Sequence, residues 1–476
     1  MPARHTRLSP SAVQSALGEA LAELRRSLEL PDSFPPEVVA EAEEVATSDA
    51  AVDGSDAERA DLRDLVFLTI DPEGSRDLDQ AMHIARAGDG FVVHYAIADL
   101  AAFVRPGGAI DAEARRRGQT LYAPDGSIPL HPEALSHGAA SLLPDEDRRA
   151  YVWRFALDAE GAHGAEDVTL ERAWVRSRRQ WTYEEAQRAI DDGSAPETLR
   201  LLAEVGPLRI AQEAARGGAS LNAPEEEIVD GPDGYTLRMR RPLPVEDWNA
   251  QISLMTGMAA AAIMQREGRG ILRTMPPADE ESLAEFRRRV ALLGRPWDDA
   301  AVDYGEYLRR LDPADPATPA VLQAASALFR GADYAAFTSP DELPADAGQA
   351  AIGAPYAHAT APLRRLVDRF VLLACTGRAD VDTLPLLPDI MRRSSALASR
   401  LESGAVDRVE AAVLHARIGD ILDAVVLAET KGGRRVQIAD PFVTATVQEA
   451  VEPGTRIRVR VESTDIATGA VVLSVA

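Results

Sequence analysis

The feature that most constrains this fold is an apolar run that leads directly into a cluster of carboxylates. Residues 65–68 (Leu-Val-Phe-Leu) have the composition of a buried strand. Asp71 follows at the end of that strand, and a proline and a glycine then turn the chain so that Asp77 and Asp79 return toward it. Carboxylates this close repel one another unless a cation such as Mg²⁺ or Mn²⁺ neutralises them. The pattern predicts a divalent-metal site, with a solvated acidic loop as the plain alternative.

A calcium EF-hand is a second way to read the same acidic segment, because its loop also begins with Asp. The spacing excludes it. The sixth position is Arg76 where the EF-hand needs glycine, and the twelfth is Met82 where it needs a bidentate glutamate.

The composition is that of an ordinary soluble protein. The 476 residues suffice for two to four domains, and the hydrophobic and charged fractions are 46% and 27%. We find no apolar run near the roughly 18 residues that cross a bilayer, and no apolar core after the first basic residues. Cys375 is the only cysteine, which excludes an intramolecular disulfide and a cysteine zinc cluster. We expect a cytoplasmic monomer with no membrane partner.

The net charge of −25 weighs against a nucleic-acid partner, but binding depends on local patches more than on total charge. Lys431 is the only lysine, so nearly all the basic charge is arginine, which can bond phosphates and stack on bases. Each arginine cluster alone is more typical of a solvated surface than of a binding site. The clusters are 172–179, 238–241, 364–369 and 456–460.

The chain divides into three predicted parts. Residues 1–58 hold two helical segments, one capped at residues 9–11 and ending near Leu30 and one over 37–46, which could form a helix-turn-helix. Residues 48–60 read as a linker or a strapped surface segment. The middle part covers 59–412 and the last part 413–476.

The middle part begins with strands and continues with helices, which predicts an α+β domain with helices packed on a mixed or antiparallel sheet. The expected strands are 66–70, 82–85, 91–98 and 151–157. The expected helices are 183–191, 196–216, 245–265, 280–293, 318–329, 362–376 and 390–417.

The last part changes to five short alternating segments separated by glycine and proline turns. Five strands in about 60 residues predict a small OB-type barrel, a module that commonly binds single-stranded nucleic acid. A plain β-cap is the alternative. Arg456, Arg458 and Arg460 alternate along one strand and so are expected on one face.

Several of these residues occur in motifs by which the chain resembles the RNB family of ribonuclease II and ribonuclease R exoribonucleases. The first motif of that family is similar to Thr69-Ile-Asp-Pro followed by Asp77-Leu-Asp79-Gln80-Ala81. Further blocks resemble the family in the same order along the chain. They are 96–100, 117–124, 128–136, 142–148, 181–186 and 356–365.

The resemblance implies processive 3′→5′ hydrolysis of single-stranded RNA to 5′-mononucleotides with a divalent metal, Mg²⁺ and as a second choice Mn²⁺. It assigns catalysis to Asp77, Asp79 and Arg364, with the arginine on the reacting phosphate. The implied metal ligands are Asp71, Asp77, Asp79 and Gln80. The implied RNA-binding residues are Tyr122, Tyr183, Gln251, His358, Thr360, Arg364 and Arg365. For His358 we favour the alternative that it only braces its loop.

The chain departs from the family pattern at two acidic positions. Gln80 stands where the family has a second aspartate, so it would be a neutral and weaker ligand. Gln251 takes the place of a glutamate near the start of a central helix. The front of the chain also has room only for a short helical unit in place of cold-shock barrels.

Three functions therefore stay open from the sequence. The first is an active exoribonuclease. The second is a catalytically silent RNA-binding protein, which Gln80 and Gln251 would fit. The third is an unrelated hydrolase of a small molecule, which the terminal barrel and the arginine clusters disfavour.

Overall fold

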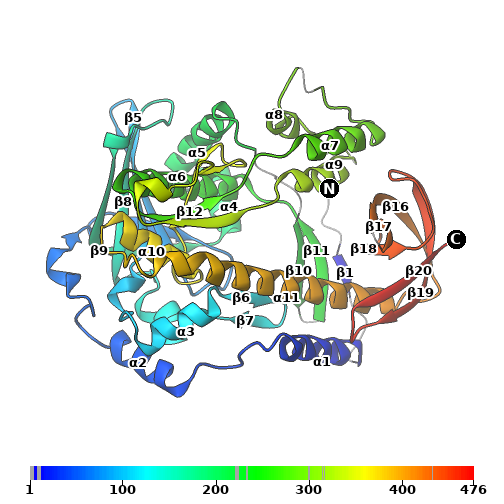
Figure 1. Cartoon of the computed structure of the whole chain (residues 1–476), viewed down its shortest axis with the longest axis horizontal. Helices are drawn as coiled ribbons and strands as arrows, with labels where there is room; N and C mark the ends of the chain where they lie inside the picture. The colour runs from blue at the N-terminus through cyan, green and yellow to red at the C-terminus, as the bar shows by residue number, and fades with distance from the viewer. Residues whose placement is uncertain are drawn as a thin grey trace.

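The structure is a computed structural model that describes residues 5–7, 12–219, 225–231, 234–298, 301–312, 315, 317–430 and 432–476. A strand-rich lobe lies at one end of the molecule and a small β-barrel at the other (Figure 1). The long helix α11 (Leu387–His415) runs between them, and the C-terminus lies in the barrel.

The central β-sheet mixes parallel and antiparallel pairings and closes on itself. Its strands are β2 (Ala60–Asp61), β3 (Phe67–Ile70), β4 (Gln80–Ala87), β5 (Gly90–Ala98), β8 (Asp147–Leu157) and β9 (Val168–Trp181). The order is β2-β9-β3-β4-β5-β8, and β8 also pairs with β9. β9 is parallel to β2 and β3, whereas the other neighbours are antiparallel. The expected α+β class with a mixed sheet is confirmed.

Large aromatic side chains fill the inside of this sheet. Tyr95 on β5 and Trp153 and Phe155 on β8 are each 0% exposed. Met82 on β4 is paired with Tyr95 across the ladder and is also buried. Burying each such side chain contributes about 2 kcal/mol, so this lobe has a rigid core on which a site can be built.

The sequence did not predict β9, because arginines obscure its alternation. Ala173, Val175 and Ser177 are buried at every second position, whereas Arg176 and Arg178 point to the more exposed side. The arginine cluster 172–179 is therefore one strand of the sheet.

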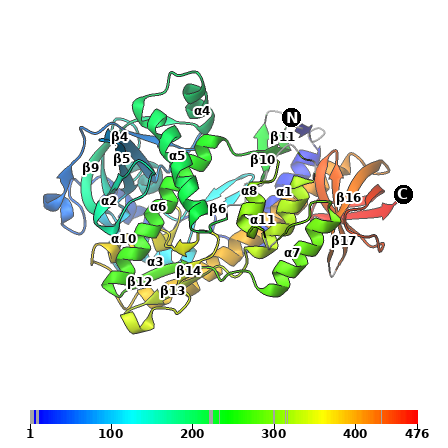
Figure 2. The same cartoon turned by 90° about the horizontal axis from the view of Figure 1, so that it is seen from above.

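Helices cover one side of the sheet as expected. They are α4 (Tyr183–Asp191), α5 (Glu197–Ala215), α6 (Pro244–Glu267) and α10 (Leu366–Cys375). α5 packs on β4 and on α6, and the two helices lie side by side in Figure 2. Gly257 in α6 permits a close approach, since a Cβ there would lie 2.1 Å from the Tyr356 ring. The backbone near Tyr356 is bonded to α6 through Ala357 N and Gly257 O at 3.1 Å.

The two N-terminal helices pack on different parts of the chain, and residues 38–45 share a core cluster with the second face of the sheet. α1 (Ala12–Ser27) lies along α11, and α2 (Pro36–Ala46) packs on α3 (Ala109–Arg117), a helix that the sequence did not predict. The expected cap at residues 9–11 lies outside the described residues.

Ion pairs fasten residues 48–60 to the sheet. Arg59 bonds Asp99 at 2.7 Å with both side chains 0% exposed. Asp56 accepts from Arg149 on β8 at 2.8 Å, and Asp53 accepts from Arg172 on β9 at 2.6 Å. Of the two expected alternatives, a linker and a strapped surface segment, residues 48–60 form the second.

The C-terminal part is a closed barrel in the order β16-β17-β18-β20-β19. Its strands are β16 (Ile421–Thr430), β17 (Gly433–Ala439), β18 (Phe442–Val447), β19 (Arg456–Asp465) and β20 (Ala470–Val475). Val459 and Val461 point into its core, whereas Arg456, Arg458 and Arg460 are exposed. The predicted OB-type barrel and the shared face of the three arginines are confirmed.

The remaining elements are smaller. A unit of α7 (Glu280–Leu292), α8 (Tyr304–Arg309) and α9 (Thr318–Ala325) has its own core around Phe286 and Trp297. Short strands complete the fold: β1 (His5–Arg7), β6 (Leu121–Ala123), β7 (Gly126–Ile128), β10 (Glu225–Gly231), β11 (Gly234–Arg240), β12 (Gly270–Thr274), β13 (Asp333–Phe337), β14 (Gly348–Gln349) and β15 (Ala354–Pro355). Within the described ranges, every helix is too short or too polar to span a bilayer.

Candidate active site

The predicted aspartates begin where two parallel strands end together. β3 and β9 are parallel, so their carboxyl ends lie at one edge of the sheet. Ile70 is paired with Trp181, and Asp71 N donates to Trp181 O at 3.0 Å. Tyr183 follows shortly after as the first residue of α4. The pairing thus brings Asp71 and Tyr183 to the same edge although they are far apart in sequence.

Neighbouring side chains hold the loop between β3 and β4 in place. Ser141 Oγ donates to Arg76 O at 2.6 Å and accepts from Leu78 N at 2.9 Å. Gln180 Nε2 donates to Ser75 O at 2.9 Å. These bonds fix the course of the loop, and with it the positions of the two aspartates that follow.

Asp79 joins this loop to a distant segment of the chain. Its side chain is buried, and its Oδ1 accepts from Leu363 N at 2.7 Å. Arg364 Nε lies 3.4 Å from Asp79 Oδ2, and the Arg364 side chain is 48% exposed. The guanidinium therefore reaches both the buried carboxylate and the solvent, as a group that meets a substrate phosphate must.

The aspartates are held in an environment that disfavours their negative charge. Burial raises the pKa of Asp71 to about 7, and the Asp77 carboxylate adds to this rise while Arg364 opposes it. Burial also raises the pKa of Asp79 well above its usual range, against the opposing effects of Arg364 and the Leu363 N–H. Oδ2 of Asp71 and Oδ2 of Asp79 are both buried without a hydrogen-bond partner. A bound cation would satisfy these oxygens.

The residues fit an open divalent-metal site, in which the protein supplies only part of the ligand shell. Within the described residues, no three His, Cys, Asp or Glu side chains converge into a complete ligand set. Mg²⁺ commonly takes one or two carboxylates and completes its shell with water and substrate phosphate. Asp71 and Asp79 supply such oxygens, and Asp77 is close enough to shift the pKa of both.

Gln80 has a different environment from that expected of a ligand. Its Nε2 donates to Thr360 O at 2.7 Å, and its Oε1 accepts from Tyr95 OH at 2.5 Å. Ser253 Oγ, on α6, is 3.4 Å from the same Oε1 and 2.7 Å from the tyrosine hydroxyl. Both ends of the amide are thus bonded to protein. The ligand role of Gln80 stays a prediction, and this geometry favours a positioning role.

The segment that carries Arg364 is shaped by a buried carboxylate. Asp368 Oδ1 accepts from Ala361 N at 2.7 Å and from Arg365 Nη2 at 2.8 Å. Arg364 O accepts from Thr120 N at 2.8 Å. The guanidinium of Arg365, predicted to bind RNA, is therefore paired inside the protein. The predicted helix 362–376 begins only at Leu366, because these bonds hold residues 361–365 as a loop.

Two other predicted RNA-binding residues in this segment contact protein. Thr360 is 4% exposed, and its carbonyl is the one bonded by Gln80. His358 Nδ1 lies 2.7 Å from Tyr334 OH. Of the two roles considered for His358, RNA contact and bracing of its loop, this contact fits bracing. RNA contact by either side chain stays a prediction.

The two predicted stacking tyrosines differ in exposure. Tyr122 on β6 is 57% exposed and lines a cavity of about 310 Å³ together with Arg364, Arg365 and Glu402. Tyr183 is partly buried, and Asn249 Nδ2 lies 3.4 Å from its hydroxyl. Tyr122 therefore lies at the surface beside Asp77, whereas Tyr183 lies deeper beside Asp71. Stacking of either ring on a base stays a prediction.

Gln251 lies in another cavity. Its side chain is 5% exposed, and Nε2 donates to Glu213 Oε2 at 2.5 Å. With Asp247 and Leu308 it lines a space of about 580 Å³ that includes neither Tyr122 nor Arg364. RNA contact by Gln251 remains a prediction that this placement does not support.

The sequence missed the residues that orient the site. Tyr95, Ser253 and Ser141 come from three separate elements, and nothing in their local sequence marks them. Asp368 could have been found, since it stands three residues after Arg365 within the predicted helix 362–376, a spacing at which opposite charges pair.

Comparison with known proteins decides the family. The RNB domain matches residues 59–374, and the RNase II-type exonuclease C-terminal S1 domain matches residues 420–476. The chain belongs to the RNB family. The resemblance read from its motifs is thereby confirmed.

Curated relatives are named ribonuclease R. The protein from Aquifex aeolicus is 26% identical over 454 residues, which cover 89% of this chain and 62% of the relative. That from Escherichia coli is 27% identical and covers 72% of this chain and 43% of its own length. The chain thus spans less than two thirds of these RNB-family relatives.

Solved structures share the fold at low identity. Mycoplasma genitalium RNase R in complex with ribose-methylated single-stranded RNA has a TM-score of 0.86 at 19% identity, covering 97% of this chain and 78% of that one. Yeast Ssd1, a pseudonuclease, has a TM-score of 0.66 at 16% identity, covering 90% and 55%. Since the RNB fold occurs in nucleases and in a pseudonuclease, activity must be argued from the site.

Proposed function

We propose that this RNB protein is a metal-dependent exoribonuclease that hydrolyses single-stranded RNA processively from the 3′ end to 5′-mononucleotides. The observation that carries the proposal is Asp79, a buried carboxylate oriented by Leu363 N at 2.7 Å, whose Oδ2 makes no hydrogen bond and lies 3.4 Å from Arg364 Nε. Asp71, Asp77 and Asp79 together carry more negative charge than Arg364 alone compensates, and a protein that only bound RNA would gain nothing from this cost.

Asp71, Asp77 and Asp79 would hold the metal, Mg²⁺ or Mn²⁺. When bound, the metal would supply Lewis acidity toward the phosphate and a water of lowered pKa. Arg364 would bond the same phosphate, because its guanidinium is exposed and its position is fixed by Asp79. Tyr122 would stack on the terminal base, and Tyr183 would border the buried side of the site.

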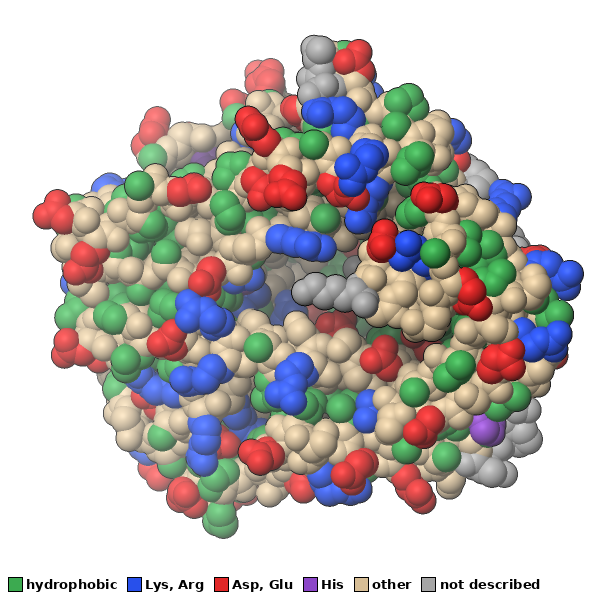
Figure 3. All heavy atoms as spheres, turned by 45° about the vertical axis from the view of Figure 1, so that its right-hand side comes forward, with side chains coloured by type: hydrophobic (Ala, Val, Ile, Leu, Met, Phe, Trp, Pro, Cys, Tyr) green, Lys and Arg blue, Asp and Glu red, His purple; other side chains and the backbone are tan. Residues whose placement is uncertain are grey.

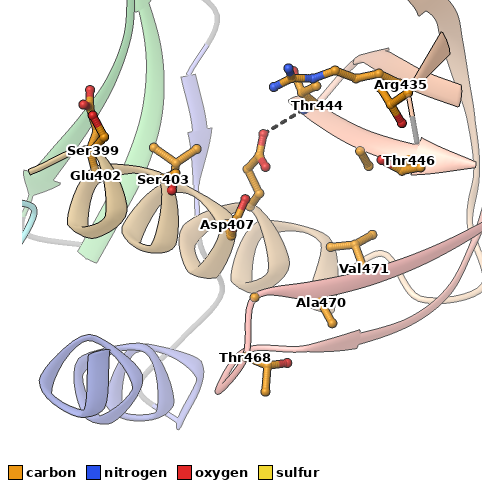
Figure 4. Close-up of a pocket in the computed structure, with 15 residues that line it drawn as sticks. Ser399, Glu402, Ser403, Asp407, Arg435, Thr444, Thr446, Thr468, Ala470 and Val471 are labelled. Atoms are coloured by element: carbon orange, nitrogen blue, oxygen red, sulfur yellow. Dashed lines mark hydrogen bonds between the residues drawn. The ribbon is translucent and has the colours of Figure 1, made fainter. Parts of the chain in front are cut away.

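The surface offers a path for the rest of the RNA. Glu402 on α11 lines the cavity of Tyr122 and Arg364 and also a larger one of about 750 Å³. Figure 4 shows the larger cavity between one face of α11 and the C-terminal barrel, with Arg435 on the barrel side. A strand held from the barrel to the catalytic cavity would stay bound between cleavages, which is the physical basis of processivity.

This path carries both signs of charge. Asp407 and Glu410 line it on α11, opposite Arg435. Figure 3 likewise shows a hollow with acidic and basic side chains around it. Phosphates would face the arginine, whereas riboses and bases would face the acidic helix, whose oxygens can accept their hydrogen bonds.

The predicted ranges 1–58, 59–412 and 413–476 are proposed as the N-terminal unit, the catalytic domain and the RNA-binding barrel. A monomeric state and a cytoplasmic location remain proposals. Sedimentation of the purified chain tests the first.

The alternative is a catalytically silent RNA-binding protein, which Gln80 and Gln251 favour. An assay of labelled single-stranded RNA with Mg²⁺, with Mn²⁺ and with EDTA separates the two. We expect mononucleotide release with either metal and none with EDTA. RNA binding without cleavage under all three conditions would favour the alternative.

A further inference from the structure

A second cavity lies away from the catalytic site and has mostly apolar walls. Its volume is about 690 Å³, and it is enclosed by the second halves of α5 and α6 and by the connection between β8 and β9. Met258, Ala259 and Ile263 on α6 and Val168 at the start of β9 form the apolar wall. It shares no lining residue with the cavity of Tyr122 and Arg364.

Arg209 lines this cavity and has no carboxylate partner among the described residues within 4.0 Å. Arg209 is 4% exposed. Nη1 donates to Gly161 O at 2.7 Å, and Nε is buried with no hydrogen-bond partner. A buried guanidinium that bonds only one backbone carbonyl keeps most of its charge uncompensated.

Arg216 lines the same cavity two turns further along α5 and is similarly placed. Its Nε donates to Ile352 O at 2.7 Å, and its Nη2 is buried with no partner. Among the described residues, neither Arg209 nor Arg216 forms an ion pair within 4.0 Å. Asp158 and Glu213 act on them only from farther away.

Arg209 and Arg216 carry the same charge and repel each other, so their placement in one cavity is unusual. Burial lowers the pKa of Arg209 to about 10, and the nearby Arg216 adds to this effect. The chain has 76 acidic residues against 51 basic ones, so a neutralising carboxylate would be easy to supply. An arrangement that leaves both cations without one is typical of a site that receives an anion from outside.

We propose that this cavity binds a small organic anion. Its phosphate or carboxylate group would lie on Arg209 and Arg216, where the planar guanidinium presents paired donors. Its apolar body would pack against Met258 and Ile263. The volume suits a ligand of the size of a mononucleotide or a medium-chain fatty acid. The site is independent of the proposed nuclease activity.

Titration calorimetry with two probes, 5′-AMP and decanoate, tests this site in the full chain. Arg209→Met removes the charge, and Ala262→Phe places a ring in the cavity while keeping both arginines. Ala262 is exposed on α6 and lines the cavity, so this second variant avoids the core. Arg200→Met is the matched control, because Arg200 is an exposed arginine on the same helix.

We expect one molecule of at least one probe to bind per chain, and both cavity variants to bind it at least tenfold more weakly. Arg200→Met should bind like the wild type. Binding of the phosphate probe alone or of the carboxylate probe alone identifies the head group. Absence of binding by both probes would overturn the proposal. Binding of 5′-AMP that survives Ala262→Phe would belong to the catalytic cavity and would overturn it too.

Discussion

At the scale of single residues, the proposed site depends on which side chains would hold a metal and which only hold other side chains in place. Asp79 has a free oxygen beside Arg364, whereas Gln80 next to it has none. The amide of Gln80 donates to Thr360 O, a bond that a carboxylate cannot make. Gln80 is thus suited to hold the segment that carries Arg364.

Gln80→Glu tests this role, because it keeps the length of the side chain and removes the donor. We expect kcat to fall at least tenfold and the free energy of unfolding to fall by about 2 kcal/mol, since the Thr360 carbonyl loses its partner. The Mg²⁺ concentration at half-maximal activity should not decrease. Tyr95→Phe, which removes the donor to the other end of the amide together with the contact to Ser253 Oγ, should cost about 1 kcal/mol.

A metal titration separates positioning from ligation. If Gln80→Glu reached half-maximal activity at lower Mg²⁺ with kcat preserved, Gln80 would be a metal ligand after all.

At the scale of elements, the sequence predicted those strands and helices whose local hydrophobic pattern is clear. The strands 66–70 and 91–98 and the helix 183–191 lie within one residue of β3, β5 and α4. β9 was missed because arginines obscure its alternation, and Asp53 and Asp99, the partners of its buried Arg172, come from distant segments. The motif predicted the aspartates of the site. Its supporting residues, such as Tyr95 and Ser253, come together only through the fold.

The strapped segment 48–60 gives an element-scale prediction on pH. The hydrogen bond from Arg149 lowers the pKa of Asp56 below its usual range, so the ion pair stabilises the protein above about pH 4 and is lost as the pH falls below that. We expect Asp56→Asn to lower the free energy of unfolding by about 2 kcal/mol at pH 7.

Urea unfolding at several pH values measures this loss, which should shrink between pH 4 and pH 2.5. Asp49→Asn is the control, because the exposed Asp49 bonds Arg149 only through its backbone carbonyl. A loss that stayed constant over this pH range would show that the charge of Asp56 is not the cause.

The barrel strand β19 gives a second element-scale prediction. Arg456, Arg458 and Arg460 share its exposed face, and three phosphate contacts would contribute about two units to the salt slope on single strands. Replacing all three with serine should weaken binding of long RNA and flatten that slope, while short oligonucleotides are still cleaved.

Fluorescence anisotropy at several salt concentrations measures the slope. The control replaces three exposed arginines elsewhere, Arg116, Arg200 and Arg310, and makes the same change in net charge. Equal effects of the two triple variants would mean that total charge, not the barrel face, controls binding.

At the scale of the whole molecule, an acidic RNB protein would guide RNA along α11 from a barrel at one end to a carboxylate cluster at the other. Its net charge of −25 would slow the approach of RNA, so affinity would come from local arginines and bound metal. The proposed function therefore depends on whether the cluster around Asp79 cleaves RNA.

The most direct measurement follows single-stranded RNA labelled at its 3′ end or its 5′ end, with Mg²⁺, in the wild type and in Asp79→Asn. We predict that the wild type releases labelled mononucleotide from the 3′ label at once and from the 5′ label only at the end. Asp79→Asn should bind RNA with similar affinity but cleave it at least a hundredfold more slowly, while Asp89→Asn, in the exposed β4–β5 turn, should match the wild type. Cleavage by Asp79→Asn at the wild-type rate, or RNA binding without cleavage by the wild type, would contradict the account.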